Sequence, residues 1–164
     1  MREILFRAKI EKPVGYKKGY NIHKSDWVKG SLITGYERPM IVRITGDRVF
    51  HREAYWVDPK TVGQYTGLED KNVKDIFEGD IVSFFGMRGI IVQECGAFGI
   101  VGRGYIDYGL LESKIPYNIN ANFCFCDTFI SLWELWFNYE QDDNPLYEVE
   151  VIGNIYDNPE LLRE

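Results

Sequence analysis

Few residues of this 164-residue chain have the chemistry and the spacing of a metal site. The two histidines, His23 and His51, lie far apart in the sequence and have no cysteine at zinc-ligand spacing. Cys124 and Cys126 lack a second ligand pair, and on a strand both thiols would share one face, which favours core packing. The remaining cysteine, Cys95, leaves an odd number for disulfides. We therefore expect no metal ion.

The other candidates for enzyme chemistry are a glycine cluster and an acidic pair. Gly99-x-x-Gly102-x-Gly104 is neither a Walker loop nor a dinucleotide fingerprint, and it follows no βαβ pattern. Asp142-Asp143 lies in a polar segment, which favours a solvated loop over a cation site. The sequence also shows no nucleophile elbow and no Ser/His/Asp set. We predict that the chain is not an enzyme and that it carries no cofactor.

Charge is divided unevenly along the chain. Lys and Arg total 19 against 25 Asp and Glu, a net charge of −6. Residues 1–60 hold 13 basic and 7 acidic side chains, a net of +6, whereas residues 61–164 hold 6 and 18, a net of −12. Such asymmetry is typical of a basic surface for nucleic acid, or of two faces that attract each other within or between chains. An ordinary solvated surface is the alternative.

Nucleic-acid binding, if the chain has it, belongs to the basic half. Lysines and arginines would hold phosphates, and the interleaved Tyr20, Trp27 and Tyr55 would stack on bases. The basic candidates are Lys17, Lys18, Lys24, Lys29, Arg43, Arg48 and Arg52. The glycines and valines of 79–92 loosely resemble the KOW-like pattern of small RNA-contacting barrels, but this half is the acidic one.

The elements that must position these residues are predominantly β strands. The composition, with 11 Tyr, 10 Phe, 4 Trp and 16 Gly, suits pleated surfaces joined by tight turns. Alternation predicts strands over 2–10, 31–34, 40–44 and 147–152. From Ile76 onward, short apolar runs separated by glycine turns are typical of a small barrel or sandwich.

One short helix is expected near 129–141. Five apolar residues there share a face at helical spacing: Phe129, Leu132, Trp133, Trp136 and Phe137. A strand over 123–130 before a shorter helix fits the same residues nearly as well. No apolar stretch approaches the roughly 18 residues of a membrane helix, and the N-terminus lacks the features of a signal peptide. We therefore expect a cytoplasmic protein that does not enter a membrane.

Four segments carry a resemblance to a known family: 1–7, 62–82, 96–100 and 151–162. They agree in order and position with the YopX family of bacteriophage and prophage proteins, which the chain therefore resembles from end to end. The motif residues, which we interpret as structural, are Gly63, Gln64, Tyr65, Thr66, Gly67, Glu78, Gly79, Asp80, Gly153 and Asn154. Residues 8–55 and 103–146 depart from the family pattern.

The resemblance implies a fold and no assigned activity. It implies an SH3-type barrel over 76–164, a smaller β-rich part over 1–66, and a connecting turn or linker over 67–75. In the turn before the first barrel strand, we expect the Asp80 side chain to bond N–H groups two residues on. Val73 stands where the family more often has glycine, which argues against a type I′ turn there. After Pro159 we expect a terminal helical turn.

These observations favour a phage- or prophage-encoded accessory protein of the bacterial cytoplasm. We expect it to act through protein–protein contacts and to form a homo-oligomer, with residues 1–60 of one chain against residues 61–164 of another. A protein partner from the phage or its host fits the same charges. The alternative is a nucleic-acid-binding module that uses the basic N-terminal half.

Overall fold

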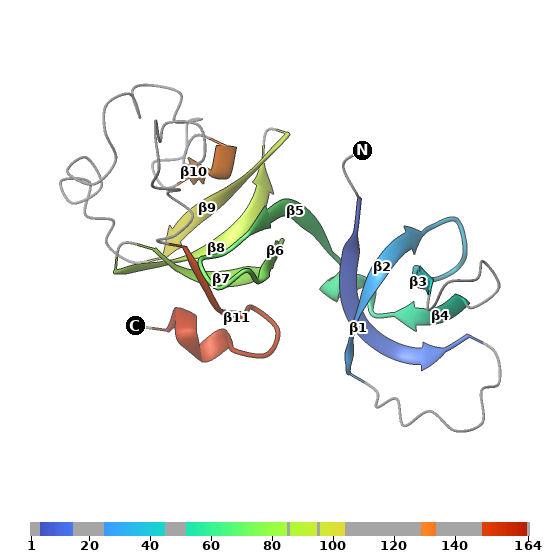
Figure 1. The fold of residues 1–164 in the computed structure, drawn as a ribbon. Coiled ribbons are helices and arrows are strands. Elements are labelled where there is room, and N and C mark those ends of the chain that lie inside the picture. Colours follow the sequence, from blue (N-terminus) through green and yellow to red (C-terminus); the bar gives the residue numbers. More distant parts are fainter. Residues whose placement is uncertain are drawn as a thin grey trace. The chain divides into compact units, whose positions relative to one another are not determined.

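In the computed structural model, antiparallel strands make up most of the described part of the chain (Figure 1). It divides into two compact units, Met1–Gly67 and Leu68–Glu164. The part of the chain that the structure describes contains no long helix, so the prediction of a mainly β protein is confirmed. The described residues are 4–14, 25–44, 52–84, 86–94, 96–103, 129–133 and 149–163.

The N-terminal unit is a ring of four strands. Its strands are β1 (Phe6–Pro13), β2 (Trp27–Ile33), β3 (Met40–Ile44) and β4 (Arg52–Val57). Each pairs antiparallel with the next, and β1 pairs through its first half with β2 and through its second half with β4. The register of β1 against β4 shifts between Ile10 and Lys12, as expected where a strand bends to pass between two neighbours. The ring is therefore a small closed barrel.

Alternate residues of these strands fill the barrel. The core consists of Ala8, Ile10, Val28, Ile41, Tyr55 and Val57. Ala8 and Ile10 confirm the alternation predicted for the first strand, because both are buried on one face of β1. The strand predicted over 2–10 begins later than expected, because Ile4 precedes β1 and is 64% exposed.

Strand β5 (Gly63–Glu69) leads out of the first unit into the second. It follows a short 3-10 turn, η1 (Pro59–Thr61), and pairs with β1 at its start and with β6 (Asp75–Phe77) at its end. Residues 67–75, expected as a connecting turn or linker, are the last residues of β5, a tight turn and the start of β6.

The C-terminal unit is a curved sheet around one core. β7 (Asp80–Phe84), β8 (Met87–Glu94) and β9 (Ala97–Arg103) form a meander, flanked by β10 (Phe129–Ser131) beside β9 and β11 (Glu150–Asn154) beside β7. The nine buried residues of the core are Ile76, Val82, Phe84, Ile91, Ile100, Ile130, Leu132, Val149 and Val151. A final 3-10 turn, η3 (Pro159–Leu162), lies where a helical turn was predicted.

A small barrel was predicted and is present, but the complete ring of strand pairs lies in the N-terminal unit. In the C-terminal unit the described strands form the five-stranded sheet order β10-β9-β8-β7-β11. Closure of the first ring depends on pairing between β1 and β4, which are distant in the sequence. The local alternation of residues therefore did not reveal it.

The helix predicted over 129–141 does not begin at Phe129. Residues 129–131 form β10, and Leu132 and Trp133 are helical; residues 134–141 lie outside the described residues. The alternative of a strand before a shorter helix matches the described part. Phe129 and Ile130 pair with Val101 and Ile100 of β9 and are both buried, so the strand ladder outweighs the helical spacing. Across the described residues, no helix has the length and apolar character to cross a membrane.

Candidate functional site

Three cations and a tryptophan share the outer face of β1 and β2. The strand register places Arg7 opposite Lys29 and Lys9 opposite Trp27. All four alternate with the buried Ala8 and Val28, so they point away from the barrel core. We call Arg7, Lys9, Trp27 and Lys29 the cationic tryptophan face.

The indole ring is the centre of this face. The Arg7 guanidinium carbon lies 5.0 Å from the ring centroid of Trp27, and the Lys9 ammonium lies 5.6 Å from it. Both distances are within the range of a cation–π interaction. Trp27 is half-buried and Lys29 is exposed. The face thus presents positive charge beside an aromatic surface that solvent still reaches.

The basic residues predicted to bind nucleic acid are not gathered in one place. Lys29 belongs to the cationic tryptophan face, whereas Arg43 lies on β3 and Arg52 on the outer side of β4. The structure adds Arg7 and Lys9, which the sequence analysis missed. Their alternation along β1 was visible, but their position opposite Lys29 and Trp27 depends on the register. The other predicted contacts lie outside the described residues: Lys17, Lys18, Lys24, Arg48 and Tyr20.

Arg43 is bound to a buried carboxylate instead. Its Nε donates to Glu53 Oε2 at 2.6 Å, and the Tyr55 hydroxyl donates to the same oxygen at 2.9 Å. Glu53 is 6% exposed and Tyr55 is 3% exposed. The Tyr55 ring is therefore not available to stack on a base, contrary to the expectation from sequence.

The protonation of this cluster follows from its contacts. The hydrogen bond to Glu53 raises the pKa of Arg43 above its usual value. Burial, followed by the hydrogen bond to Glu53, raises the pKa of Tyr55 above its usual value of 10.0. The cluster joins β3 to β4 through hydrogen bonds among Arg43, Glu53 and Tyr55. We therefore interpret it as a structural contact between the two strands.

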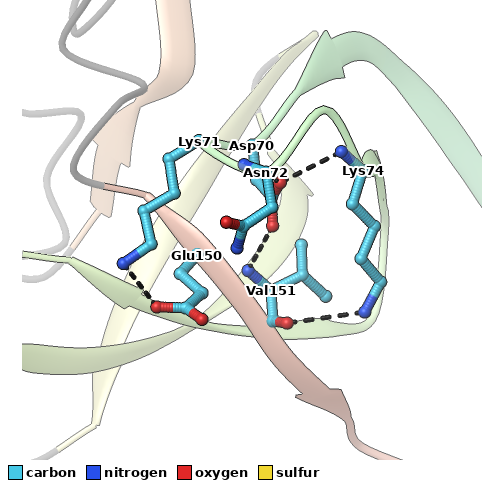
Figure 2. Close-up of polar contacts among 6 residues, drawn as sticks. All are labelled: Asp70, Lys71, Asn72, Lys74, Glu150 and Val151. Atoms are coloured by element: carbon cyan, nitrogen blue, oxygen red, sulfur yellow. Dashed lines mark hydrogen bonds and ion pairs between the residues drawn. The ribbon is translucent and has the colours of Figure 1, made fainter.

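A second polar cluster lies in the C-terminal unit around Asp70 (Figure 2). Asp70 Oδ1 accepts from the backbone N–H groups of Asn72 and Lys74, at 2.8 and 3.0 Å. Oδ2 accepts from the N–H of Val151 on β11, at 2.9 Å. Asp70 is 6% exposed, so one buried carboxylate joins residues 70–74, the Asp70 turn, to β11.

The two lysines of the Asp70 turn add contacts to the same strand. The Lys71 N–H donates to the Val149 carbonyl at 3.0 Å, and Lys71 Nζ forms an ion pair with Glu150 at 2.5 Å. Lys74 Nζ donates to the Val151 carbonyl at 3.4 Å (Figure 2). Within the described residues, no group of three His, Cys, Asp or Glu side chains is suited to hold a metal ion. We therefore interpret the Asp70 turn as structural.

Val73 gives this turn an unusual backbone. Its φ is +61°, in the left-handed region, although valine is branched at Cβ. Asn72 does not have a positive φ, so the turn is not of type I′, as expected with a valine here, although Val73 itself is left-handed. Asp70 Oδ1 accepts hydrogen bonds from the N–H groups of Asn72 and Lys74, on both sides of Val73, and these bonds hold the conformation against its steric strain.

The motif residues near Asp80 also form a structural turn. Gly79 has a φ of +82°, and its N–H donates to the Ile91 carbonyl at 2.8 Å. The buried Asp80 Oδ2 accepts from the Phe77 N–H at 2.8 Å. The carboxylate therefore reaches back three residues and closes the turn between β6 and β7 from its far end.

The remaining motif residues lie in or beside strands. Gly63, Gln64, Tyr65, Thr66 and Gly67 are part of β5, Glu78 lies in the turn before β7, and Gly153 lies in β11. Asn154 ends β11, where its Oδ1 accepts from the N–H groups of Tyr156 and Asp157 at 3.0 and 2.9 Å. The residues considered as metal ligands or as an acidic pair lie outside the described residues: His23, His51, Cys95, Cys124, Cys126, Asp142 and Asp143.

Comparison with known proteins agrees with the end-to-end resemblance. A family model described as YopX protein matches residues 6–163, which include both units, the Asp70 turn and the cationic tryptophan face. Among curated proteins, none matches the chain. Because the matched segment covers nearly all of the sequence, the chain belongs to the YopX family.

Proposed function

We propose that the chain is a non-enzymatic binding protein that acts through protein contacts and associates with further copies of itself. The observation that carries the proposal is that the change from net positive to net negative charge along the sequence coincides with the boundary between the two structural units. Residues 61–67 carry no charge, so the first unit, Met1–Gly67, keeps the net +6 of residues 1–60. The second unit, Leu68–Glu164, keeps the net −12.

Opposite charges on two units steer association between copies, and apolar contact then stabilises it. The outer side of β2, β3 and β4 offers such contact. Ile33, Met40 and Trp56 lie side by side in the register, and Tyr36 packs edge-on against Trp56 with centroids 6.1 Å apart. Ile44 on the same side is 65% exposed, Tyr36 64% and Ile33 37%. These five residues form the apolar outer patch.

The proposed contact joins unlike surfaces, the N-terminal unit of one copy and the C-terminal unit of the next. A contact of this kind is heterologous, and it forms a closed ring when the rotation between copies permits. The family membership supports an origin in a phage or prophage, and so a place of action in the cytoplasm of the bacterial host. A partner protein from either source would use the same charge complementarity.

Mass in solution tests self-association. Light scattering coupled to size exclusion is expected to give a multiple of the 19.1 kDa chain at about 50 mM salt and a smaller mass at about 500 mM, because salt screens the attraction. A monomer at low salt contradicts the proposal. So does a monomer whose hydrodynamic radius alone changes with salt, since that behaviour indicates docking within one chain.

A pair of matched variants tests the apolar outer patch. Ile44→Ser lies in the patch at 65% exposure, and Ile4→Ser lies outside it in the same unit at 64% exposure. We expect Ile44→Ser to shift the population towards monomer and Ile4→Ser to leave the mass unchanged. Equal effects of the two variants would show that the patch is not the contact.

A further inference from the structure

We infer that the cationic tryptophan face binds single-stranded nucleic acid, a function separate from self-association. A polyanion with aromatic bases needs two kinds of partner, cations for its phosphates and an aromatic ring for its bases. On this face both lie within one patch, because Arg7 and Lys9 are 5.0 and 5.6 Å from the Trp27 ring.

The strand register gives the cations an ordered spacing. Arg7 and Lys9 follow one another along β1 on the same face, about 7 Å apart in the strand direction. Lys29 stands opposite Arg7 on β2, where facing side chains lie about 5 Å apart at Cβ. Arg7 and Lys9 therefore lie over the indole, and Lys29, two residues after Trp27 on β2, is exposed to solvent. A nucleic-acid backbone that crosses the two strands therefore meets cations on both of them.

An indole ring beside cations on a pleated surface selects single strands. Stacking on Trp27 requires a base whose face is exposed, which a duplex offers only at its ends. The face contains no amide side chain of the kind that reads adenine edges, so stacking and phosphate contacts supply the affinity. Binding of this kind tolerates many sequences and weakens steeply with salt.

The charge of the surrounding unit agrees with this role. The N-terminal unit carries the net +6. The acidic residues beside the face in the described part of the chain include Asp26, which precedes Trp27, and Glu11, which follows Lys9 by two residues on β1 and is paired with Arg38. Asp58, whose N–H donates to the Lys9 carbonyl, is a further one. Arg52 lies on the outer side of β4, across from Ile44 of β3, and so on the opposite side of the ring from the β1–β2 pair. It provides a cation of the same unit that the proposal does not use.

Fluorescence anisotropy of the full chain with a labelled oligo-thymidine strand tests the inference. At about 50 mM salt we expect saturable binding, lost at about 300 mM, with an unlabelled duplex of the same length competing less well than the unlabelled strand. Lys29→Gln is expected to weaken binding several-fold and to reduce the slope of log affinity against log salt by about 0.7. Arg52→Gln, with the same change of charge, is expected to change affinity less than twofold.

The stacking part is tested separately. Trp27→Leu is expected to weaken binding about 5- to 100-fold, while Trp27→Tyr, which keeps a ring, retains most of the affinity. If Trp27→Leu does not fold, the comparison of Lys29→Gln with Arg52→Gln decides. The inference would be overturned if Lys29→Gln and Arg52→Gln lost equal amounts of affinity. It would also be overturned if the unmodified chain showed no salt-sensitive binding, or if the duplex competed as well as the single strand. None of these outcomes depends on the mass measurement, so the two proposals fail independently.

Discussion

Replacing Asp70 by asparagine tests whether one carboxylate holds β11 to the rest of the C-terminal unit. In the native turn, Oδ1 accepts two backbone N–H groups and Oδ2 accepts the Val151 N–H. An asparagine keeps one oxygen and replaces the other by an NH2 donor. If the oxygen stays towards Asn72 and Lys74, the NH2 group faces the Val151 N–H, and two donors meet where a donor and an acceptor stood.

The size of the effect follows from these contacts. A hydrogen bond to a charged group contributes about 1.5–3 kcal/mol, and a buried donor left without an acceptor costs about 1–3 kcal/mol. Asp70 is 6% exposed, so water does not replace the lost acceptor. We expect Asp70→Asn to lower the free energy of unfolding by about 2–4 kcal/mol.

Urea denaturation followed by circular dichroism measures this change, and with an ordinary urea dependence the midpoint falls by about 1–2 M. Hydrogen exchange at the Val151 amide is expected to accelerate more than exchange within β8 and β9. The control is Glu69→Gln, which removes one negative charge from the exposed neighbouring residue. A loss below about 0.5 kcal/mol for Asp70→Asn, or equal losses for both variants, would refute the reasoning.

Three further predictions rest on single residues. Val73→Gly removes the steric strain of a β-branched residue at φ +61° and is expected to stabilise the chain by about 0.5–1 kcal/mol in the same urea assay. Val73→Ala, which keeps a Cβ, is expected to stabilise it less. Destabilisation by Val73→Gly would contradict the strain. Gly89→Ala places a Cβ 2.3 Å from Ile100 Cγ2 and 2.9 Å from the Val101 carbonyl oxygen. We therefore expect the free energy of unfolding to fall by about 2–3 kcal/mol. An unchanged free energy would show that β8 and β9 can move apart. Because the folded-state pKa of Tyr55 is raised above 10.0, its contribution is complete below that pH and is lost as pH rises through the raised value. Urea midpoints between about pH 9 and 11 should therefore fall more for the native chain than for Tyr55→Phe, and parallel falls would refute the assignment.

The sequence could predict the strands and turns that depend on short-range patterns of residues. The alternation of Phe6, Ala8 and Ile10 and the turn glycine Gly79 each depend on neighbours a few residues away, and they locate strands and turns correctly. Phe129 shows the limit. Its helical spacing with Leu132 is real, but pairing with Val101 decides its structure.

The candidate sites depend on contacts that no local pattern contains. Asp70 looked like part of a polar linker, because its partner Val151 is 81 residues further along the chain. The cationic tryptophan face needs the register of β1 against β2, and a slip of one residue would turn Lys9 into the core. Arg43 counted as a phosphate contact because the buried Glu53 opposite it is recognisable only in the folded barrel.

The pairing of β7 with β11 has a consequence for synthesis. The N-terminal ring is complete once β4 has been made, but about 65 residues separate Phe84, at the end of β7, from Glu150, at the start of β11. At roughly 5–20 residues per second, the ribosome delivers β11 about 3–13 s after β7. Until then β7, with Ile81, Val82 and Phe84 destined for burial, offers an unpaired edge to any other nascent chain. The yield of folded protein should therefore fall with crowding of ribosomes on the messenger, even when the finished chain is stable.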